Sequence, residues 1–381
     1  MFICSSLLIT VSALIGLDLA SNKAFATLPL AIQFIAVMIT SIPASLIMGT
    51  WGRRAGFLTA GVIGVAGGCI ALVAIYRHSF LLFCVATFCF GAFSAFGNYY
   101  RFTAPEIVPE DKKNVAISWV MAGGVVAAFI GPNLATWSQN LIDMSVYAGA
   151  FVIAIIVYLA SMITVSFMDL PPPPAKKTNT GSGRPLVQIM CQPVFVVAVV
   201  CAAFGYGTMN LVMTATPLAM YHNEMMLRDT AFVIQWHVVA MFAPSFFTGN
   251  LINRFGILNI LISGTVLCVI CVLINLTGVT VWHFWTALIT LGVGWNFLFV
   301  GGTTLLTECY EPEEKTATQA INDFIVFSTV SVTALSSGTI HYNYGWTTVN
   351  LTVLPLLIFV GVCVMFLKVH RQHRAMNEAQ S

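Results

Sequence analysis

Arginines placed between glycines are the first residues whose type and spacing point to chemistry. GTWGRRAG at residues 49–56 contains Arg53 and Arg54, and GNLINRFG at residues 249–256 contains Arg254. Glycines permit a tight turn and a close approach of two helix ends, and a guanidinium group binds carboxylates bidentately. These segments are therefore candidates for charged contacts that open and close.

The two segments form part of a repeat with an offset of 200 residues (249 − 49). A carboxylate follows each segment: Glu106 begins EIVPEDKK, and Glu308 begins ECYEPEEK. We expect two equivalent gating contacts, Arg54 with Glu106 and Arg254 with Glu308; the alternative is that the arginines only set the topology. The offset aligns Gly49 with Gly249, Arg54 with Arg254, and Gly56 with Gly256.

These arginines stand in a chain with few other charges. Of its 381 residues, 58% are hydrophobic and 8% are charged, and the mean hydropathy is +0.89, whereas a soluble domain carries roughly 25% charged residues. Apolar runs of about 20 residues cross a bilayer as helices, because lipid offers the backbone no hydrogen-bond partner. The sequence therefore predicts an all-α polytopic membrane protein in contact with the lipid bilayer, and its net charge of +2 points to no nucleic acid.

Long apolar runs separated by short polar segments predict twelve transmembrane helices, whose ends are uncertain by about four residues. The short alternating segments of a transmembrane barrel are absent from the sequence. The expected helices cover residues 1–18, 25–49, 56–76, 79–101, 114–137, 143–167, 192–217, 229–252, 256–276, 281–307, 317–338 and 346–367.

The distribution of basic residues fixes the expected sidedness. Of the 16 Lys and Arg residues, thirteen fall on one side of these helices and three on the other, so the positive-inside rule places both termini in the cytoplasm. The polar segment MDLPPPPAKKTNTGSGRPLVQIM cannot continue a helix through its four consecutive prolines. We predict an N-terminal six-helix bundle at 1–167, a cytoplasmic linker at 168–190, a C-terminal bundle at 191–368 and a cytoplasmic tail at 369–381.

Polar side chains deep in apolar helices are costly, which makes them candidates for a substrate site. Aromatic and amide groups together suit a planar, polar, largely uncharged small molecule. For each amide, an interhelical hydrogen bond is an equally weighted alternative. The candidates are Gln33, Asn133, Tyr206, Asn210, Thr214, Gln235, Trp236, His237, Trp295 and Asn296.

Three titratable residues are candidates for proton coupling. His237 has an ordinary pKa near physiological pH, and Asp18 and Asp323 are carboxylates in or near predicted helices. Most of the ten cysteines lie in apolar runs, and CVIC at residues 268–271 has no His or acidic neighbour. We therefore expect no metal site and no cofactor. No nucleotide-binding loop or hydrolase motif occurs, so we expect neither an ATP-driven pump nor an enzyme.

Both arginine segments resemble the signature loop of the major facilitator superfamily, G-x-x-x-[R/N]-R-x-G. The resemblance implies two pseudo-symmetric six-helix bundles that transport a small organic solute by alternating access. It also implies a secondary active transporter, coupled to an ion or a proton, that works as a monomer in a bacterial inner membrane. At the position of Arg53 the family usually has Asp, which faces the N-terminal end of the eleventh helix. An arginine there is repelled by the helix dipole, so we expect Asp323 to be its partner across the bundles.

Other segments bear on the substrate class. GGVVAAFIGPN at residues 123–133 is similar to the glycine-proline motif of exporters in this superfamily, whereas Thr87 stands where many proton-coupled drug exporters carry an arginine. QWHVVAMFAPSFFTG, GWNFLFVGGTTLLTE and QAINDFIVF resemble a bacterial subgroup with members that import riboflavin or similar vitamins. Vitamin import and efflux of drugs or metabolites stay open as alternatives, and a non-transporting receptor is the third.

Overall fold

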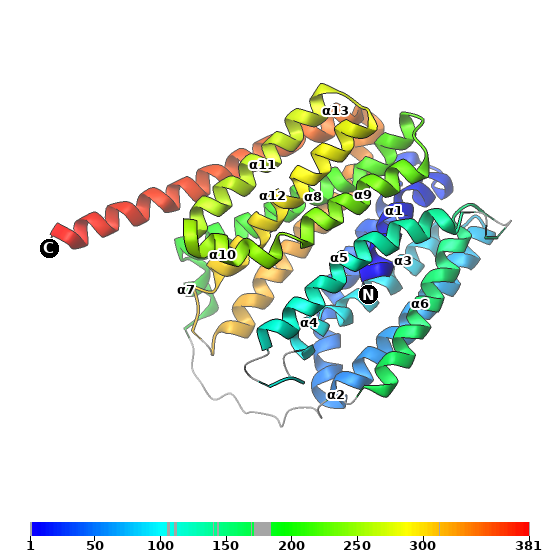
Figure 1. The fold of residues 1–381 in the computed structure, drawn as a ribbon, viewed down its shortest axis with the longest axis horizontal. Coiled ribbons are helices and arrows are strands. Elements are labelled where there is room, and N and C mark those ends of the chain that lie inside the picture. The colour runs from blue at the N-terminus through cyan, green and yellow to red at the C-terminus, as the bar shows by residue number, and fades with distance from the viewer. Residues whose placement is uncertain are drawn as a thin grey trace.

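The chain is described by a computed structural model that covers residues 2–104, 107–109, 113–139, 141–142, 145–168, 170, 184–311 and 313–380. Within these ranges every regular element is a helix (Figure 1). The elements are α1 (Phe2–Leu19), η1 (Lys23–Phe25), α2 (Leu28–Tyr76), α3 (Phe80–Gly97), α4 (Tyr100–Thr103), α5 (Lys113–Trp137), α6 (Ala148–Phe167), α7 (Leu186–Met190), α8 (Pro193–His222), α9 (Leu227–Phe242), α10 (Ser245–Phe255), α11 (Ile257–Thr277), α12 (Val281–Leu306) and α13 (Lys315–Gln380).

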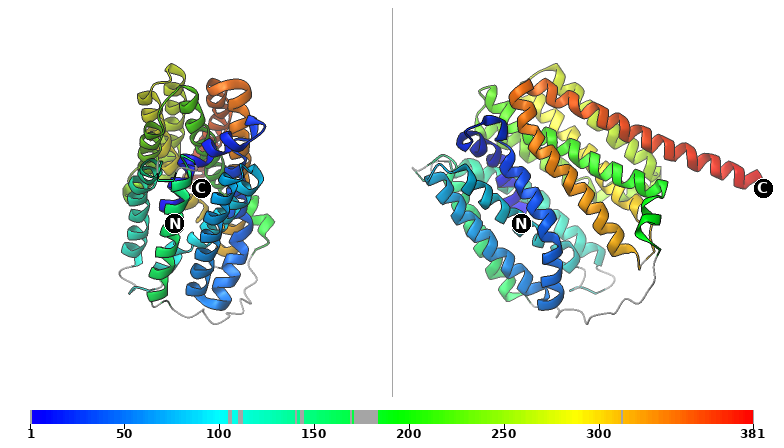
Figure 2. Two further views of the ribbon diagram at one scale, coloured as in Figure 1. Left: turned by 90° about the vertical axis from the view of Figure 1, so that its right-hand side faces the viewer. Right: turned by 180° about the vertical axis from the view of Figure 1, so that it is seen from behind.

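Two of these helices reverse direction at a glycine. Gly52 in α2 has φ 89° and Gly345 in α13 has φ 80°, a backbone conformation that glycine adopts without steric cost. Figure 2 shows the two arms on either side of each reversal running back along the bundle. α2 and α13 therefore each supply two membrane spans.

The described residues contain eight helices that are long and apolar enough to cross a membrane, or nine when α9 and α10, which meet at 45°, count as one bent span. Because α2 and α13 each reverse direction and so supply two spans, the number of spans rises from nine to eleven. The 25-residue α5 is the twelfth helix of membrane length. Proline at the first turn of α2 and of α8 helps start these helices, because the first N–H groups of a helix need no partner within it. The predicted all-α membrane fold is confirmed.

Two hydrophobic cores divide the helices into halves. One core contains buried residues between Cys4 and Val165, and the other contains residues between Ile189 and Leu367, with Ala128 of α5 as an addition from the first half. Each half thus buries its own apolar side chains. Residues 369–380 were expected to form a tail. They instead continue α13 as a helix that extends beyond the rest of the protein (Figure 1).

The halves meet at the end of the molecule that holds η1. There the backbone N–H of Gly338 donates to Thr27 Oγ1 at 3.0 Å, and Thr339 Oγ1 donates to the carbonyl oxygen of Ala24 at 3.0 Å. Leu218 of the second half packs with Leu14 and other residues of the first half in a small shared cluster. Toward the end that holds the α2 reversal and α7, the two halves diverge (Figure 2).

Candidate functional site

A central cavity of about 170 Å³ lies between the two halves. Its walls come from α1, α2 and α3 of the first half and from α8, α9 and α13 of the second. The lining residues are Phe2, Ser5, Ser6, Ile9, Gln33, Phe34, Val37, Ser94, Asn98, Tyr206, Met209, Met213, Val238, Met241, Phe242 and Phe327.

The two walls of this cavity differ in chemistry. The first half supplies its hydroxyl and amide side chains, including Ser6, Gln33 and Asn98, and the second half supplies thioether and aromatic side chains with the single hydroxyl of Tyr206. Among the described lining residues there is no Asp, Glu, Lys, Arg or His. Burying a charge without a partner is costly, so this cavity suits an uncharged ligand with one polar edge and one apolar face.

Two of the predicted substrate residues, Gln33 and Tyr206, line the cavity. A third, Trp295, supports it from behind, because its ring lies 5.3 Å from the ring of Tyr206 in an edge-to-face arrangement. The same indole lies 6.4 Å from the ring of Phe242. Edge-to-face packing of this kind fixes ring orientation, so Trp295 holds two lining residues in place without facing the cavity.

Three predicted substrate residues bond to protein groups within the second half, where Asn210 and Asn296 join helices and Thr214 contacts Asn210 on the same helix. Asn210 donates to the carbonyl oxygen of Val330 at 3.0 Å and to Thr333 Oγ1 at 3.3 Å, and Thr214 lies 3.5 Å from its Oδ1. The amide of Asn296 makes three bonds of 2.7 Å, to Met241, Ser245 and Thr248 at the α9–α10 bend. These buried groups have protein partners, which removes the expected reason for them to bind a ligand.

His237 is fully buried between α9 and α12 and does not line the cavity. Its Nδ1 lies 2.7 Å from the carbonyl oxygen of Leu288. A carbonyl can only accept, so Nδ1 carries the proton, while Nε2 has no partner among the described residues. Asp18, another coupling candidate, is exposed at the η1 end of α1. The coupling role of both residues stays a prediction.

The other predicted substrate residues connect the two halves. Asn133 Nδ2 on α5 donates to Gln235 Oε1 on α9 at 2.7 Å, and the rings of Phe129 and Trp236 lie 5.9 Å apart on the same pair of helices. These residues lie outside the cavity lining. They form a contact between the halves that sequence reasoning assigned to ligand binding.

Several lining residues were missed, although their helical spacing carried a signal. Ser94 near the end of α3 and Asn98 directly after that helix are four residues apart, and Met209 and Met213 continue the face of α8 that begins at Tyr206. Spacings of three, four and seven residues place side chains on one helix face. No methionine was among the predicted substrate residues, so Met209 and Met213 were overlooked.

The two arginine segments do not fold as equivalent turns. In the first half the turn residue with positive φ is Gly52, before Arg53 and Arg54, whereas in the second it is Gly256, with φ 83°, after Arg254. The offset of 200 residues aligned Gly256 with Gly56, but the glycine with positive φ in the first half is Gly52. Gly56 is buried within α2 against the side chain of Met48. An added Cβ at Gly49 or Gly249 meets no atom of the described residues within 4 Å, so neither glycine serves a close approach to them.

The predicted arginine–glutamate contacts are replaced by others where the structure describes them. Glu308 forms an ion pair with Arg371 at 2.6 Å, while the Arg254 guanidinium lies 5.2 Å from the ring of Phe255. In this conformation Glu308 is paired with Arg371 of the α13 extension, and the expected Arg254–Glu308 contact stays a prediction for other conformations. Arg54 donates to the carbonyl oxygen of Ser166 at the end of α6. Its expected partner Glu106 lies outside the described residues.

Arg53 and Asp323 each have neighbours on their own side of the protein. The Arg53 guanidinium lies 5.6 Å from the ring centre of Tyr99 and its Nη1 lies 3.8 Å from the sulfur of Met48. Asp323 is exposed on α13 and accepts from the amide of Asn322 at 3.1 Å. Their pairing across the halves stays a prediction.

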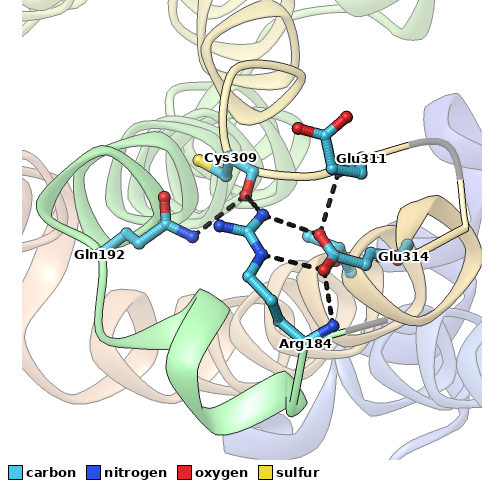
Figure 3. Close-up of polar contacts among 6 residues, drawn as sticks. Arg184, Gln192, Cys309, Glu311 and Glu314 are labelled. Carbon is cyan, nitrogen blue, oxygen red and sulfur yellow. Dashed lines mark hydrogen bonds and ion pairs between the residues drawn. The ribbon is translucent and has the colours of Figure 1, made fainter. Parts of the chain in front are cut away.

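An ion pair that the sequence did not predict fastens the end of the linker to the second half (Figure 3). Arg184 places Nη2 2.7 Å from Glu314 Oε2 and Nε 2.9 Å from Oε1. Nη2 also donates to the carbonyl oxygen of Cys309 at 3.0 Å, where Gln192 donates as well. The hydrogen bonds from Arg184, with another from the Glu311 backbone, lower the pKa of Glu314 to about 2.

Two helical halves around a central cavity within the membrane define a transporter that works by alternating access. The chain belongs to the Major Facilitator Superfamily, because the model of that family matches residues 1–295 and 228–381. It is a multi-pass membrane protein and a secondary transporter of small molecules, and it is not an enzyme.

Comparison with individual proteins gives three informative relatives. The chain is 40% identical over 358 residues to the riboflavin transporter RfnT of Brucella anthropi, which covers 93% of this chain and 90% of that protein. It is 26% identical to the uncharacterized MFS-type transporter YddS of Bacillus subtilis, over 96% and 88% of the two chains. A crystal structure of the nucleoside transporter NupG is similar in fold, with a TM-score of 0.72, 12% identity and 96% coverage of each chain.

Proposed function

We propose that this transporter carries riboflavin or a closely related planar vitamin across a bacterial cytoplasmic membrane. The observation that supports the substrate class is 40% identity to a riboflavin transporter over 93% of the chain. Vitamin import was one of the alternatives that the sequence left open.

The central cavity supports the same substrate class on chemical grounds. A flavin has a planar ring system with a polar edge, and it is uncharged at neutral pH. The cavity offers Gln33 and hydroxyl groups on one wall and Tyr206, Phe242 and methionines on the other. Thioether and aromatic side chains make favourable contacts with ring faces, and amides pair with polar ring edges.

The proposed orientation places the linker, the α2 reversal and both termini in the cytoplasm. Thirteen of the 16 basic residues fall on this side, and the halves diverge toward it (Figure 2). The conformation is then inward-facing, with the contacts of Thr27 and Asn133 holding the outer side together. In the outward-facing state, Arg53, Arg54, Arg254, Glu106, Glu308 and Asp323 take part in closing the inner side.

We further propose that a proton gradient drives the transporter as a monomer. The coupling candidates are His237, Asp323 and Asp18, none of which is among the described residues that line the cavity. A coupling group outside the cavity acts through the helices that it joins. His237 is the best placed of the three. It lies on α9, a helix that lines the cavity, and it joins α9 to α12.

The test is uptake of radiolabelled riboflavin into proteoliposomes that contain the purified protein. We expect saturable uptake above that of empty liposomes, faster when the outside is acidic, and inhibited by excess unlabelled riboflavin. Replacing Tyr206 with Ala should lower the rate about tenfold through the loss of a lining aromatic ring, whereas Gln188→Ala in the exposed α7 should not. Saturable export of a labelled drug without riboflavin uptake would overturn the proposal in favour of efflux.

A further inference from the structure

Two polar atoms of the cavity wall are buried and unpartnered. Gln33 is 6% exposed and Ser6 is 3% exposed, and both residues line the central cavity. Neither Gln33 Oε1 nor Ser6 Oγ has a hydrogen-bond partner among the described residues. A buried polar atom without a partner costs about 1–3 kcal/mol, so an orphaned pair beside a cavity indicates a ligand that supplies the missing bonds.

Buried polar atoms without a partner also occur elsewhere among the described residues, including Oδ1 of Asn275 and of Asn322, but those residues do not line the central cavity. Asn210 and Asn296 are also fully buried, but each satisfies its side chain through neighbouring helices. Gln33 comes from α2 and Ser6 from α1, both in the first half. The opposite wall holds Met209, Met213 and Phe242 and gives an apolar surface.

We propose that Gln33 and Ser6 read the imide edge of a planar heterocycle, C(=O)–NH–C(=O), while the ring lies against the second-half wall. Gln33 Oε1 accepts from the imide N–H, and Gln33 Nε2 donates to one adjacent carbonyl. The hydroxyl of Ser6 donates to the other carbonyl. A side-chain amide matches such an edge because it presents one acceptor beside one donor. This inference rests on the proposed function and assigns the groups that select its substrate.

This arrangement explains selectivity by the cost of leaving groups unpaired. A site built to hydrogen-bond a ligand N–H rejects an analogue that lacks it, because buried polar atoms of the protein are then left without partners. A ring without an imide still contacts the methionines but leaves Gln33 Oε1 unpaired. The inference therefore concerns the imide edge and not the ribityl chain of a flavin.

The experiment measures binding to the purified full chain in nanodiscs by quenching of flavin fluorescence. The probes are riboflavin and riboflavin methylated on its imide nitrogen, which lacks the N–H but keeps the ring and both carbonyls. We expect the native chain to bind riboflavin about tenfold more tightly than the methylated form. This comparison changes only the ligand, so it decides the question even if a variant fails to fold.

Variants then assign the preference to residues. Gln33→Met keeps side-chain length and should bind riboflavin about tenfold more weakly, with little preference left between the two probes. Ser6→Ala should weaken both probes about fivefold, because its carbonyl partner is present in each. Gln188→Met, at an exposed residue of α7, is the matched control and should change neither value.

The possible outcomes separate the two proposals. Equal affinity of the native chain for both probes, or an unchanged preference in folded Gln33→Met, would overturn the imide assignment while riboflavin transport stands. Failure of the native chain to bind either probe would overturn both.

Discussion

Asn133 on α5 donates its side-chain amide to Gln235 on α9 over 2.7 Å, and this bond crosses from one half of the protein to the other. Both residues were expected to bind substrate. Their actual contact lies on the α5–α9 helix pair beside the ring contact of Phe129 with Trp236. The bond therefore contributes to the contact between the halves, which must break when the protein opens outward.

Replacing Gln235 with Leu should shift the protein toward the outward-facing state. The substitution removes the acceptor and leaves the Asn133 amide with fewer partners, at a cost of about 1–3 kcal/mol to the inward-facing state. A membrane-impermeant thiol reagent should then label a cysteine at the cavity residue Met213 at least about fivefold faster from outside. Gln188→Leu is the control. An unchanged labelling rate in Gln235→Leu would show that this bond does not hold the outer side together.

Gly338 allows α13 to approach the start of α2. A Cβ at this position would lie 2.6 Å from Thr27 Oγ1, so Gly338→Ala must push the two helices apart. Overpacking of this kind costs about 1–3 kcal/mol, and we expect riboflavin uptake to fall about fivefold or more. Adding Thr27→Ala, which removes the crowded atoms, should restore part of the rate. Gly123→Ala is the control, because its Cβ would meet nothing within 4 Å.

The uptake assay separates crowding from a general defect. If Gly338→Ala and the double variant with Thr27→Ala are equally slow, crowding at Thr27 is not the cause. If Gly338→Ala transports at the native rate, the close approach of α2 and α13 is not needed for transport.

The ion pair of Arg184 with Glu314 should stabilise the protein in a pH-dependent way. Its hydrogen bonds lower the pKa of Glu314 from 4.5 to about 2, so the folded state favours the carboxylate more than the unfolded state does. The stabilisation is complete above about pH 4.5 and is lost as the pH falls toward 2. Glu314→Gln should therefore lower the melting temperature at pH 7, by an amount that shrinks at pH 3.

Two comparisons accompany this measurement. Glu313→Gln changes an exposed carboxylate in the same loop and should leave the melting temperature unchanged. A melting-temperature difference between the native chain and Glu314→Gln that is the same at pH 7 and pH 3 would contradict the account of this ion pair.

Cys191 provides a native test of sidedness. It is exposed and directly follows α7, which the proposed orientation places in the cytoplasm. A charged maleimide should label Cys191 in inverted membrane vesicles at least about tenfold more than in right-side-out vesicles. A cysteine at Lys23 in η1, introduced without the native cysteines, should show the opposite preference. Labelling of Cys191 from outside would reverse the orientation and with it the proposed inward-facing state.

Sequence reasoning placed the membrane helices well because hydropathy and span length determine them. The helix expected at 281–307 is Val281–Leu306, and the one expected at 256–276 is Ile257–Thr277. The repeat was a weaker guide to the turns. A fixed offset does not show which glycine adopts positive φ, and here Gly52 and Gly256 do so at different places relative to the arginines.

The candidate site was only partly predictable for a related reason. A polar residue in an apolar helix must have a partner, but the sequence does not show whether that partner is a ligand or a neighbouring helix. Gln33 lines the cavity and its Oε1 has no partner in the part of the chain that the structure describes, whereas Asn210 bonds to α13. Similarly, the ion pair of Glu308 with Arg371 could not be expected, because the sequence analysis assigned Arg371 to a tail outside the bundle.

Reversible cross-linking of the outer contact tests alternating access most directly. Thr339 Oγ1 lies 3.0 Å from the carbonyl oxygen of Ala24, so cysteines at these two positions, in a chain without native cysteines, should form a disulfide between the halves. The account predicts that oxidation abolishes riboflavin uptake into proteoliposomes and that reduction restores it. Continued uptake at the native rate by fully cross-linked protein would contradict the account.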